Sequence, residues 1–397
     1  PLAQRPVVVR GLADKLFPPG RSWGFDALAD LLGDLKADGI RQAPEGETLF
    51  DYADAEGMGV YSDPSTKGQT ADPVPFGEFV RRVREAGPAG SRYYLWAALL
   101  DQKEEDASGE RPLAMSPMAQ RLQGDMARFQ WHDLEGLANF GGFGRLHMVQ
   151  LFCSGARAVT ASHYDMNQNV FLQLRGAKRF VLFPPLVGAR AFAPYPVGHP
   201  RDRCAQLRLA NPDYREFPGA SRAHGQGLEA ILEEGDCLFL PLGWWHHVES
   251  LAEENVSVNL WYEGGELSRR PPERVLRPLP EAVLLELSRH LELALGEAVN
   301  CGLLPLFLPW MLAPEAFLSS QLPPSGERRK WLRCSNFALY RAVQLLPPCQ
   351  VRPWLDTLEP HRFRRVQLRK SLDVRNLTRR SRACRACSPC ESGCLRQ

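Results

Sequence analysis

Residues 160–185 read TASHYDMNQNVFLQLRGAKRFVLFPP, and this stretch decides the fold that we expect. It holds two apolar runs, NVFLQLRG and AKRFVLFPP, that meet at Gly176-Ala177, the pattern of two short strands joined by a tight turn. Runs of the same kind lie on both sides of it: LHMVQLFCSG at 146–155, GDCLFLPLGWWHHV at 235–248 and NVSVNLWYE at 255–263. The sequence therefore predicts an all-β core from about 146 to 262.

Helical patterns flank this core. Apolar side chains recur at helical spacing in 22–39 and 76–87, and a longer apolar stripe runs through 281–299. That stripe needs a surface to pack on, either the chain's own barrel or a second subunit, and the apolar stretch LLPLFLPWML at 303–312 favours a second subunit. Residues 101–128 are polar and turn-rich, which predicts a surface loop between regions and no contribution to the core.

The composition is that of a globular protein, with 397 residues, 44% of them hydrophobic and 24% charged. Its net charge of +2 is unevenly spread, because 361–397 holds 11 Lys and Arg against two acidic residues and leaves −7 for the rest. An acidic body argues against a nucleic-acid-binding protein. No run of about 18 uncharged apolar residues occurs, so we expect no transmembrane helix. Six of the ten cysteines are scattered singly, which indicates a reducing compartment.

His163 and Asp165 are two positions apart, so an extended backbone places both side chains on one face, where they can bind one metal ion. Alone this pair is a weak signal, since it also occurs as a hydrogen-bonding pair in turns. His246-His247, expected at the end of a strand 83 positions further on, strengthens it. Because consecutive strand residues face opposite sides, only one of the two histidines points into a barrel.

Two histidines and one carboxylate on one face of a metal leave positions open on the other, as in non-haem Fe(II) oxygenases. A zinc hydrolase with the same ligands, and a cupin-like barrel whose metal is structural or absent, are the competing interpretations. Lys178 shares a strand face with Phe180 and Leu182, so an inward Phe180 implies an inward lysine that needs an anionic partner. A dicarboxylic co-substrate such as 2-oxoglutarate would supply that partner, whereas a solvent-exposed rim lysine would need none.

The chain resembles the JmjC-type 2-oxoglutarate oxygenases, most closely the factor-inhibiting-HIF type of asparaginyl hydroxylase, in four successive segments: 160–185, YPVGHPRDRCAQLRLANPDYREFPG, GDCLFLPLGWWHHVES and SVNLWY. The resemblance implies a mainly β fold with flanking helices. This fold is a double-stranded β-helix, a jelly-roll or cupin-like JmjC barrel, followed by a C-terminal helical dimerisation segment. The expected regions are an N-terminal α/β region on the barrel flank, the barrel core, C-terminal helices and a low-order tail rich in Pro, Arg and Cys: 1–128, 129–265, 266–312 and 313–397.

The resemblance also assigns roles to individual residues. It makes His163, Asp165 and His246 the iron ligands and the catalytic centre. It places Tyr94, Thr160 and Lys178 at the far carboxylate of 2-oxoglutarate. It places Asn169 and Asn259 beside the iron-chelating end, and Trp261 in the wall of the pocket. All of these positions keep the expected residue types, which argues against a barrel that has lost its activity.

The substrate side departs from the family pattern. Arg203 remains from an Arg-Gln pair that reads the target carboxamide, but Cys204 stands where the glutamine would be. A thiol is a weak hydrogen-bonding group and cannot replace a primary amide. Trp96 also replaces a glutamine close to the pocket and adds bulk there. We therefore expect the oxygen-activating residues to be kept and the target preference to be altered.

The resemblance thus implies an enzyme, a 2-oxoglutarate-dependent dioxygenase that uses Fe(II), 2-oxoglutarate and O2. Its expected substrate is Asn or another side chain of a protein, such as an ankyrin-repeat protein or the transcription factor hypoxia-inducible factor. A homodimer through 281–312 and a cytoplasmic and nuclear location are expected as well, with neither membrane nor nucleic acid as partner. The alternatives are an RNA-modifying hydroxylase or a lysine demethylase of the same superfamily, and a non-catalytic JmjC-like binding scaffold.

The tail carries Cys384, Cys387, Cys390 and Cys394 at the spacing of an iron-sulfur run. No proline follows the last cysteine, no second cluster motif exists, and the surroundings are rich in arginine. We therefore interpret this run as part of an unstructured tail in preference to a zinc or cluster site.

Overall fold

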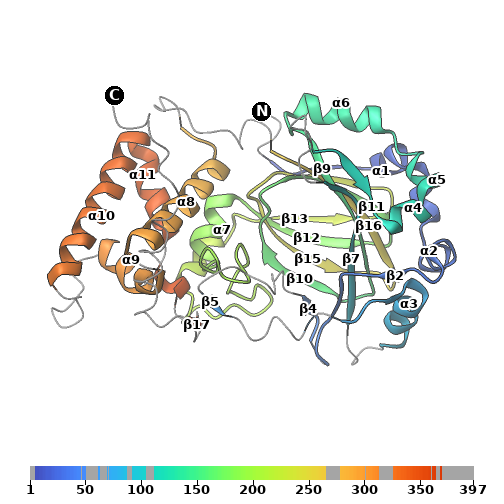
Figure 1. Ribbon diagram of the computed structural model, residues 1–397, viewed down its shortest axis with the longest axis horizontal. Helices are drawn as coiled ribbons and strands as arrows, with labels where there is room; N and C mark the ends of the chain where they lie inside the picture. Colours follow the sequence, from blue (N-terminus) through green and yellow to red (C-terminus); the bar gives the residue numbers. More distant parts are fainter. Residues whose placement is uncertain are drawn as a thin grey trace, which may run out of the picture.

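Two β-sheets form the walls of a barrel, and helices lie along one wall and beyond one end of it (Figure 1). The computed structural model describes residues 5–45, 47–50, 61–62, 69, 71–86, 92–103, 111–264, 278–299, 301–312, 325–358, 360–363 and 367–368. The predicted four-cysteine run lies outside these residues. The mostly antiparallel sheets with helices are consistent with the predicted jelly-roll.

The larger sheet has eight strands. In spatial order they are β1 (Val7–Val9), β14 (Cys237–Leu240), β11 (Gln168–Arg175), β16 (Asn255–Tyr262), β9 (Leu146–Ser154), β7 (Tyr93–Gln102) and β3 (Ile40–Gln42), with β8 (Leu113–Met115) paired to β7. Its central strands are buried on both faces. On β16, Val256, Val258 and Leu260 belong to a core shared with the N-terminal helices, whereas Asn259 and Trp261 line the barrel cavity. This two-sided burial explains why the central strands are predominantly apolar.

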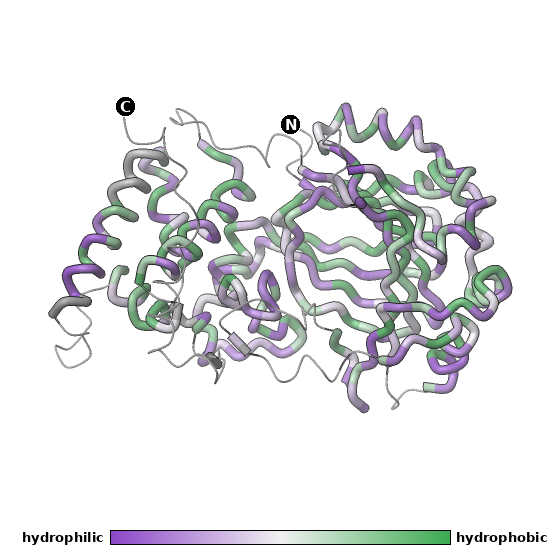
Figure 2. The backbone as a smooth tube through the Cα atoms, in the orientation of Figure 1, coloured by the Kyte–Doolittle hydropathy of each residue, from purple (hydrophilic) through white to green (hydrophobic). Residues whose placement is uncertain are grey.

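The smaller sheet has five strands. Their order is β13 (Leu228–Leu232), β12 (Lys178–Phe183), β15 (Trp245–Ser250), β10 (Val159–His163) and β4 (Leu49–Phe50). Pairing is antiparallel except between β10 and β4. Hydrophobic and hydrophilic residues alternate along these strands (Figure 2), the period-2 pattern of a sheet with one face toward a core. Two further pairs are two-stranded: β2 (Lys36–Ala37) with β6 (Val74–Pro75), and β5 (Tyr61–Ser62) with β17 (Gln367–Leu368).

The strands predicted at 146–155, 169–176, 177–185 and 255–263 are confirmed, but one predicted strand is wrong. The run at 235–248 forms two strands in different sheets, β14 in the larger and β15 in the smaller. Pro241 has no N–H for a ladder, and Gly243 takes a φ of +78°, so the chain turns between the two strands. His246 therefore lies near the start of β15 and not at the end of the strand that begins at Cys237.

Short helices cover the outer face of the larger sheet. They are α1 (Leu12–Leu16), α2 (Phe25–Leu32), α3 (Phe76–Glu85), α4 (Pro117–Arg121), α5 (Gln123–Met126) and α6 (Trp131–Gly141). The helix predicted at 76–87 is confirmed as α3. The helix predicted at 22–39 is confirmed only for Phe25–Leu32, because it ends at Gly33, which has a φ of +59°, and Lys36–Ala37 forms β2. The prediction that 101–128 stays out of the core is wrong, because Met118, Leu122 and Met126 are buried in it. These three residues recur every fourth position, a helical stripe that the polar residues around them conceal.

The C-terminal helices form a separate layer joined to the barrel through α7 (Pro185–Ala191). They are α8 (Glu281–Val299), α9 (Leu304–Leu312), α10 (Ser325–Leu345) and α11 (Pro348–Leu355). The expectation of low order beyond 313 is therefore wrong for 325–358, where Trp331 of α10 is buried against Phe307 of α9. Leu284 and Leu295 of α8 are covered within the chain, so the homodimer through 281–312 stays a prediction.

Within the described ranges, no single helix has the length and apolar composition to cross a bilayer, and α8 with α9 reaches them only as a pair bent by 114°.

Candidate metal centre

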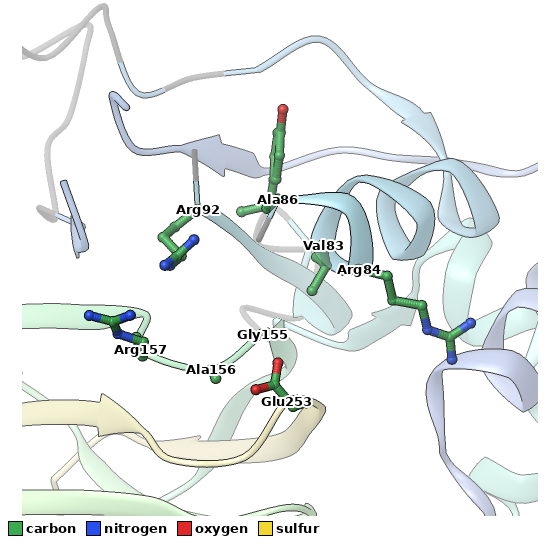
Figure 3. A pocket seen from close by; sticks show the side chains of 9 residues that line it. Val83, Arg84, Ala86, Arg92, Gly155, Ala156, Arg157 and Glu253 are labelled. Atoms are coloured by element: carbon green, nitrogen blue, oxygen red, sulfur yellow. The ribbon is translucent and has the colours of Figure 1, made fainter. Parts of the chain in front are cut away.

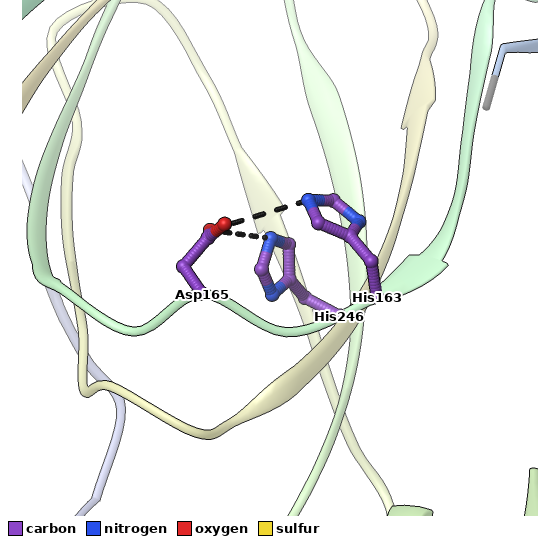
Figure 4. A group of neighbouring side chains, drawn as sticks. All are labelled: His163, Asp165 and His246. Carbon is purple, nitrogen blue, oxygen red and sulfur yellow. Dashed lines mark ion pairs between the residues drawn. The ribbon is translucent and has the colours of Figure 1, made fainter. Parts of the chain in front are cut away.

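His163, Asp165 and His246 meet inside the barrel (Figure 4). His163 ends β10, and its register partner on β15 is His246, so antiparallel pairing brings two residues far apart in sequence side by side. Asp165 lies in the connection from β10 to β11, where its carbonyl oxygen accepts a hydrogen bond from the N–H of Gly243 at 2.8 Å. The turn before β15 and the connection after β10 therefore fix each other.

The three side chains are close enough to share one ion. The Oδ2 atom of Asp165 lies 3.4 Å from Nε2 of His246 and 4.0 Å from Nε2 of His163. One ligand atom from each residue can be chosen so that all lie within 4.8 Å of one another. His163 and His246 are buried and Asp165 is 14% exposed, so the group presents a single open side.

Backbone carbonyls orient both imidazole rings. Nδ1 of His163 lies 2.8 Å from the oxygen of Ala161, and Nδ1 of His246 lies 3.0 Å from the oxygen of Trp244. A carbonyl oxygen only accepts hydrogen bonds, so each Nδ1 must carry the proton and donate. The lone pair is then on Nε2, the atom that faces Asp165, as metal-binding histidines require.

The charge states also suit a metal. Burial, with His246 adding to it, lowers the pKa of His163 to about 3, so this ring is neutral at pH 7. Burial works to raise the pKa of Asp165, but the nearby histidines and Arg203 outweigh it and hold the pKa of this carboxyl below its usual range. A neutral imidazole and an ionised carboxylate are the forms that bind metal ions.

His247, next to His246 in sequence, faces away from this group. Its Nε2 lies 3.3 Å from Oε1 of Glu249, a residue on the same face of β15. The alternation of side chains along a strand therefore selects His246 and excludes His247, as predicted.

The cavity beside the triad is lined by every residue to which the family resemblance assigns a co-substrate role. These are Tyr94, Thr160, Asn169, Lys178, Asn259 and Trp261, and they lie together with the three ligand residues and a set of apolar side chains: Phe152, Phe171, Phe180, Leu240 and Val248. The structure thus brings the predicted set together, while the individual roles stay predictions.

Lys178 is 2% exposed and points into this cavity with Phe180, as the strand pattern predicted. Its Nζ donates to Oγ of Ser257 at 3.1 Å and lies 5.9 Å and 5.3 Å from the ring centroids of Tyr94 and Phe171. Burial lowers the pKa of Lys178 to about 8. Within the ranges that the structure describes, no carboxylate pairs with this ammonium group, so an anionic ligand would complete its surroundings.

Three acceptor atoms near the metal end of the cavity are buried and, among the described residues, lack a hydrogen-bond partner: Oδ2 of Asp165, Oδ1 of Asn169 and Oδ1 of Asn259. Buried acceptors of this kind are rare unless a cation, water or ligand satisfies them. Two imidazoles, one carboxylate and unsatisfied oxygens fit a metal ion with bound water or ligand.

At the other end of the cavity, Lys178 supplies a cation next to Tyr94, which hydrogen-bonds the side chain of Thr160. The two ends therefore differ, and they suit a ligand with one chelating and one anionic group.

The substrate-side residues are not all at the cavity. Nη1 of Arg203 lies 4.0 Å from Oδ1 of Asp165, which places it at the open side of the triad. Cys204 pairs with His163 through the backbone, but its side chain is 1% exposed and does not line the cavity. Trp96 shares a face of β7 with Tyr94, yet it lies against Arg41, 5.4 Å from ring centroid to guanidinium, and is not a cavity residue either.

Sequence reasoning missed two polar neighbours of the site. Ser257 accepts the hydrogen bond of Lys178, and Gln150 accepts one from Nε1 of Trp261 at 2.9 Å. Ser257 is two positions from Asn259 on β16, so its place in the apolar run NVSVNLWY assigned it to the cavity face. Gln150 pairs with Asn259 across β9 and β16, a register that the sequence alone does not reveal.

Another cavity lies between the end of α3, the start of β7 and the turn from β9 to β10 (Figure 3). Its charged residues include Arg92, Arg157 and Glu253, and none of the triad lines it. Because its charged residues are mostly arginines and it has no group of histidine and acidic ligands, this cavity differs from the candidate metal centre.

Comparison with known proteins gives the family. A model of the cupin-like domain matches residues 2–266. The chain is 31% identical over 126 residues to a protein of Arabidopsis thaliana named lysine-specific demethylase JMJ31, covering 32% of this chain and 23% of that one. It is 34% identical over 117 residues to human HSPB1-associated protein 1, covering 28% and 23%.

The third relative is the tRNA wybutosine-synthesizing protein 4 of Neurospora crassa, 31% identical over 207 residues that cover 51% of this chain and 15% of that protein. The chain thus matches about a quarter or less of the length of these relatives. The family match covers the whole barrel and the triad within it, and the chain belongs to the cupin-like domain family.

Proposed function

We propose that this protein is an Fe(II)- and 2-oxoglutarate-dependent hydroxylase that acts on asparagine or another side chain of a protein. The observation that carries the proposal is one cavity with a buried His163–Asp165–His246 face at one end and the buried cation Lys178 at the other. Both features are needed, because a zinc hydrolase would use the three ligands and have no use for a buried lysine behind them.

Each residue then has a task. His163, Asp165 and His246 would hold the iron, which together with 2-oxoglutarate and O2 supplies the oxidising chemistry when bound. Lys178, with Tyr94 and Thr160 beside it, binds and orients the far carboxylate of the co-substrate. The apolar residues of the cavity wall exclude water, and this strengthens the charge interaction of Lys178.

Two other substrate classes have support of their own. The Arabidopsis relative is named a lysine-specific demethylase, and the Neurospora relative is named for tRNA modification. Hydroxylation of an N-methyl group releases formaldehyde, so the same residues would serve a demethylase. Cys204, with its side chain off the cavity, favours a target preference different from that of an asparagine reader.

A homodimer through 281–312 and a cytoplasmic and nuclear location complete the proposal. Leu293 and Leu306, each 48% exposed, are apolar surface that a second copy of α8 and α9 could cover.

The test is mass spectrometry of an ankyrin-repeat protein after incubation with the purified chain, Fe(II), 2-oxoglutarate and air. A gain of one oxygen with the wild type but not with Asp165→Ala supports the proposal, and peptide mapping identifies the side chain. Formaldehyde from a methylated histone peptide, without oxygen gain on the repeat protein, would favour the demethylase. Succinate formation from 2-oxoglutarate equal in wild type and Asp165→Ala would contradict all of the oxygenase functions.

A further inference from the structure

The segment 194–206, which follows α7, carries Arg203 to the open side of the triad. Its backbone runs beside the end of β10, where the N–H of Ala205 donates to the oxygen of Ser162 at 2.8 Å and the N–H of Tyr164 donates to the oxygen of Arg203 at 3.2 Å. Arg203 itself has a φ of +70°, a left-handed conformation that a side chain with a Cβ rarely adopts. Contacts around the segment must therefore hold it.

One contact beside Arg203 comes from Arg289 of α8. Its guanidinium forms a two-pronged pair with the carboxylate of Asp202, with Nη1 to Oδ1 at 2.5 Å and Nη2 to Oδ2 at 2.8 Å. Nη1 also donates to the hydroxyl of Tyr164 at 3.3 Å. Arg289 thus contacts the residues next to Arg203 and next to His163 at the same time. The Arg289 and Asp202 side chains are 14% and 22% exposed, so this pair is largely shielded from water.

A second set of contacts holds the rest of the segment. The N–H of Val197 donates to Oε1 of Glu292 on α8 at 2.8 Å, and Glu292 forms a buried ion pair with Arg362 at 2.5 Å. The side-chain amide of Gln206 donates to the backbone oxygen of Arg362. Residues near both ends and in the middle of the segment are therefore attached to the C-terminal helical layer. All of these attachments lie beyond residue 266, where the family match ends.

We propose that Arg289 is a positioning residue which, through Asp202, sets Arg203 against Asp165, so that the C-terminal helices control the substrate side of the metal centre. The inference deepens the proposed function, on which it rests for the statement that substrate enters at this side. The anchoring of Arg203 through Asp202 and Arg289 does not depend on that function, and it can be measured without turnover.

Cys204 provides a native reporter of the segment. Cys204 is 1% exposed. Cys153 and Cys237 are buried as well, whereas Cys349 is exposed. We expect Arg289→Gln to raise the rate of alkylation of Cys204 by at least about tenfold, since a lost charge-assisted pair lowers the free energy of local opening. Peptide mass spectrometry should show Cys153 and Cys237 unchanged, which excludes global unfolding, and Cys349 labelled at once in every variant. Asp202→Asn is the second variant should Arg289→Gln not fold.

The matched control is Arg352→Gln, which removes another arginine of the helical layer from an ion pair with Asp356 at the surface. Its Cys204 should remain as slow as in the wild type. Arg289→Lys keeps one charge but not the two-pronged geometry, so it should restore only part of the protection. Unchanged Cys204 labelling in both Arg289→Gln and Asp202→Asn would refute the anchoring.

Co(II) binding distinguishes positioning from a merely structural role. Arg203 places a positive charge 4.0 Å from a metal ligand, so Arg203→Gln should tighten Co(II) binding by about threefold or more. Arg289→Gln should produce the same change if it releases Arg203, and the double variant should show no further gain. An Arg289→Gln variant that exposes Cys204 but binds Co(II) like the wild type would overturn the proposal. Neither experiment requires hydroxylase activity, so a failure of the proposed function would be seen separately.

Discussion

Replacement of Lys178 by methionine should stabilise the protein without ligands, although it removes a residue that we place in the binding machinery. Lys178 is 2% exposed, and burial lowers its pKa from 10.5 to about 8. A shift of this size means that the charged lysine weakens folding by about 3 kcal/mol at pH 7. The methionine side chain is only one heavy atom shorter, has no charge to desolvate and suits the contacts with Phe171 and Tyr94.

The sign of the effect follows from proton binding. Between pH 8 and pH 10.5 the unfolded chain keeps the proton of Lys178 while the folded protein has released it, so the stability of the wild type rises with pH in this window. Below pH 8 both states are charged and the full penalty remains. The advantage of Lys178→Met should therefore be about 3 kcal/mol at pH 7, fall to less than half of that at pH 9.5 and nearly vanish by pH 10.5.

Urea unfolding in the presence of EDTA, at pH 7 and at pH 9.5, measures these differences. Lys36→Met, at an exposed lysine of β2, is the matched control and should change the free energy of unfolding by less than about 0.5 kcal/mol at either pH. Added 2-oxoglutarate with Co(II) should stabilise the wild type more than Lys178→Met, because only the wild type offers a cation to the far carboxylate. A loss of stability in Lys178→Met at pH 7, or a gain that does not depend on pH, would refute the view that a desolvated charge lies behind the metal centre.

Three further results are expected. His246→Gln should abolish detectable Co(II) binding by visible absorption, whereas His247→Gln, at the outward-facing neighbour, should retain it; equal effects would refute the assignment of faces on β15. Cys204→Gln should leave the product distribution in peptide mass spectrometry unchanged, because the side chain at this position does not line the cavity; a shift toward hydroxylated asparagine would refute this placement. Arg362→Met should lower the free energy of unfolding by about 3 kcal/mol because it leaves the Glu292 carboxylate buried and unpaired, while adding Glu292→Leu should recover most of this loss in a urea titration.

The sequence predicted the barrel and its metal centre because both depend on local patterns. Alternation along 177–185 placed Lys178 on the face of Phe180 and Leu182, and the weak signal of His163 and Asp165 was strengthened by His246 and by the family resemblance, which also supplied Asn259. The split of 235–248 into two sheets was missed, since an apolar run interrupted by Pro241 and Gly243 does not reveal which neighbours its halves pair with. Local patterns thus give faces, whereas pairing partners depend on the tertiary structure.

The contacts between α8 and the segment at 194–206 could not be predicted for a similar reason. Arg289 and Asp202 are single charged residues 87 positions apart, and nothing in their local sequence distinguishes them from surface charges. The order at 325–358 was missed because the apolar residues of α10, among them Trp331 and Ala338, are interspersed with basic residues. Burial there comes from α9, so the periodicity of α10 alone is too weak to predict it.

The order in which the barrel can be completed follows from its first strand. Val7 of β1 pairs with Phe239 of β14, and Val9 pairs with Cys237, so the earliest strand of the chain forms the edge beside one of the latest. During synthesis β1 must wait until nearly the whole barrel has emerged, and loop closure over such a distance makes folding slow. Until then the edge of β14 is open to pairing with other chains. Strand β1 therefore pairs late in folding and covers the edge of β14. A chain shortened by its first ten residues should aggregate during refolding, even though every metal ligand is present.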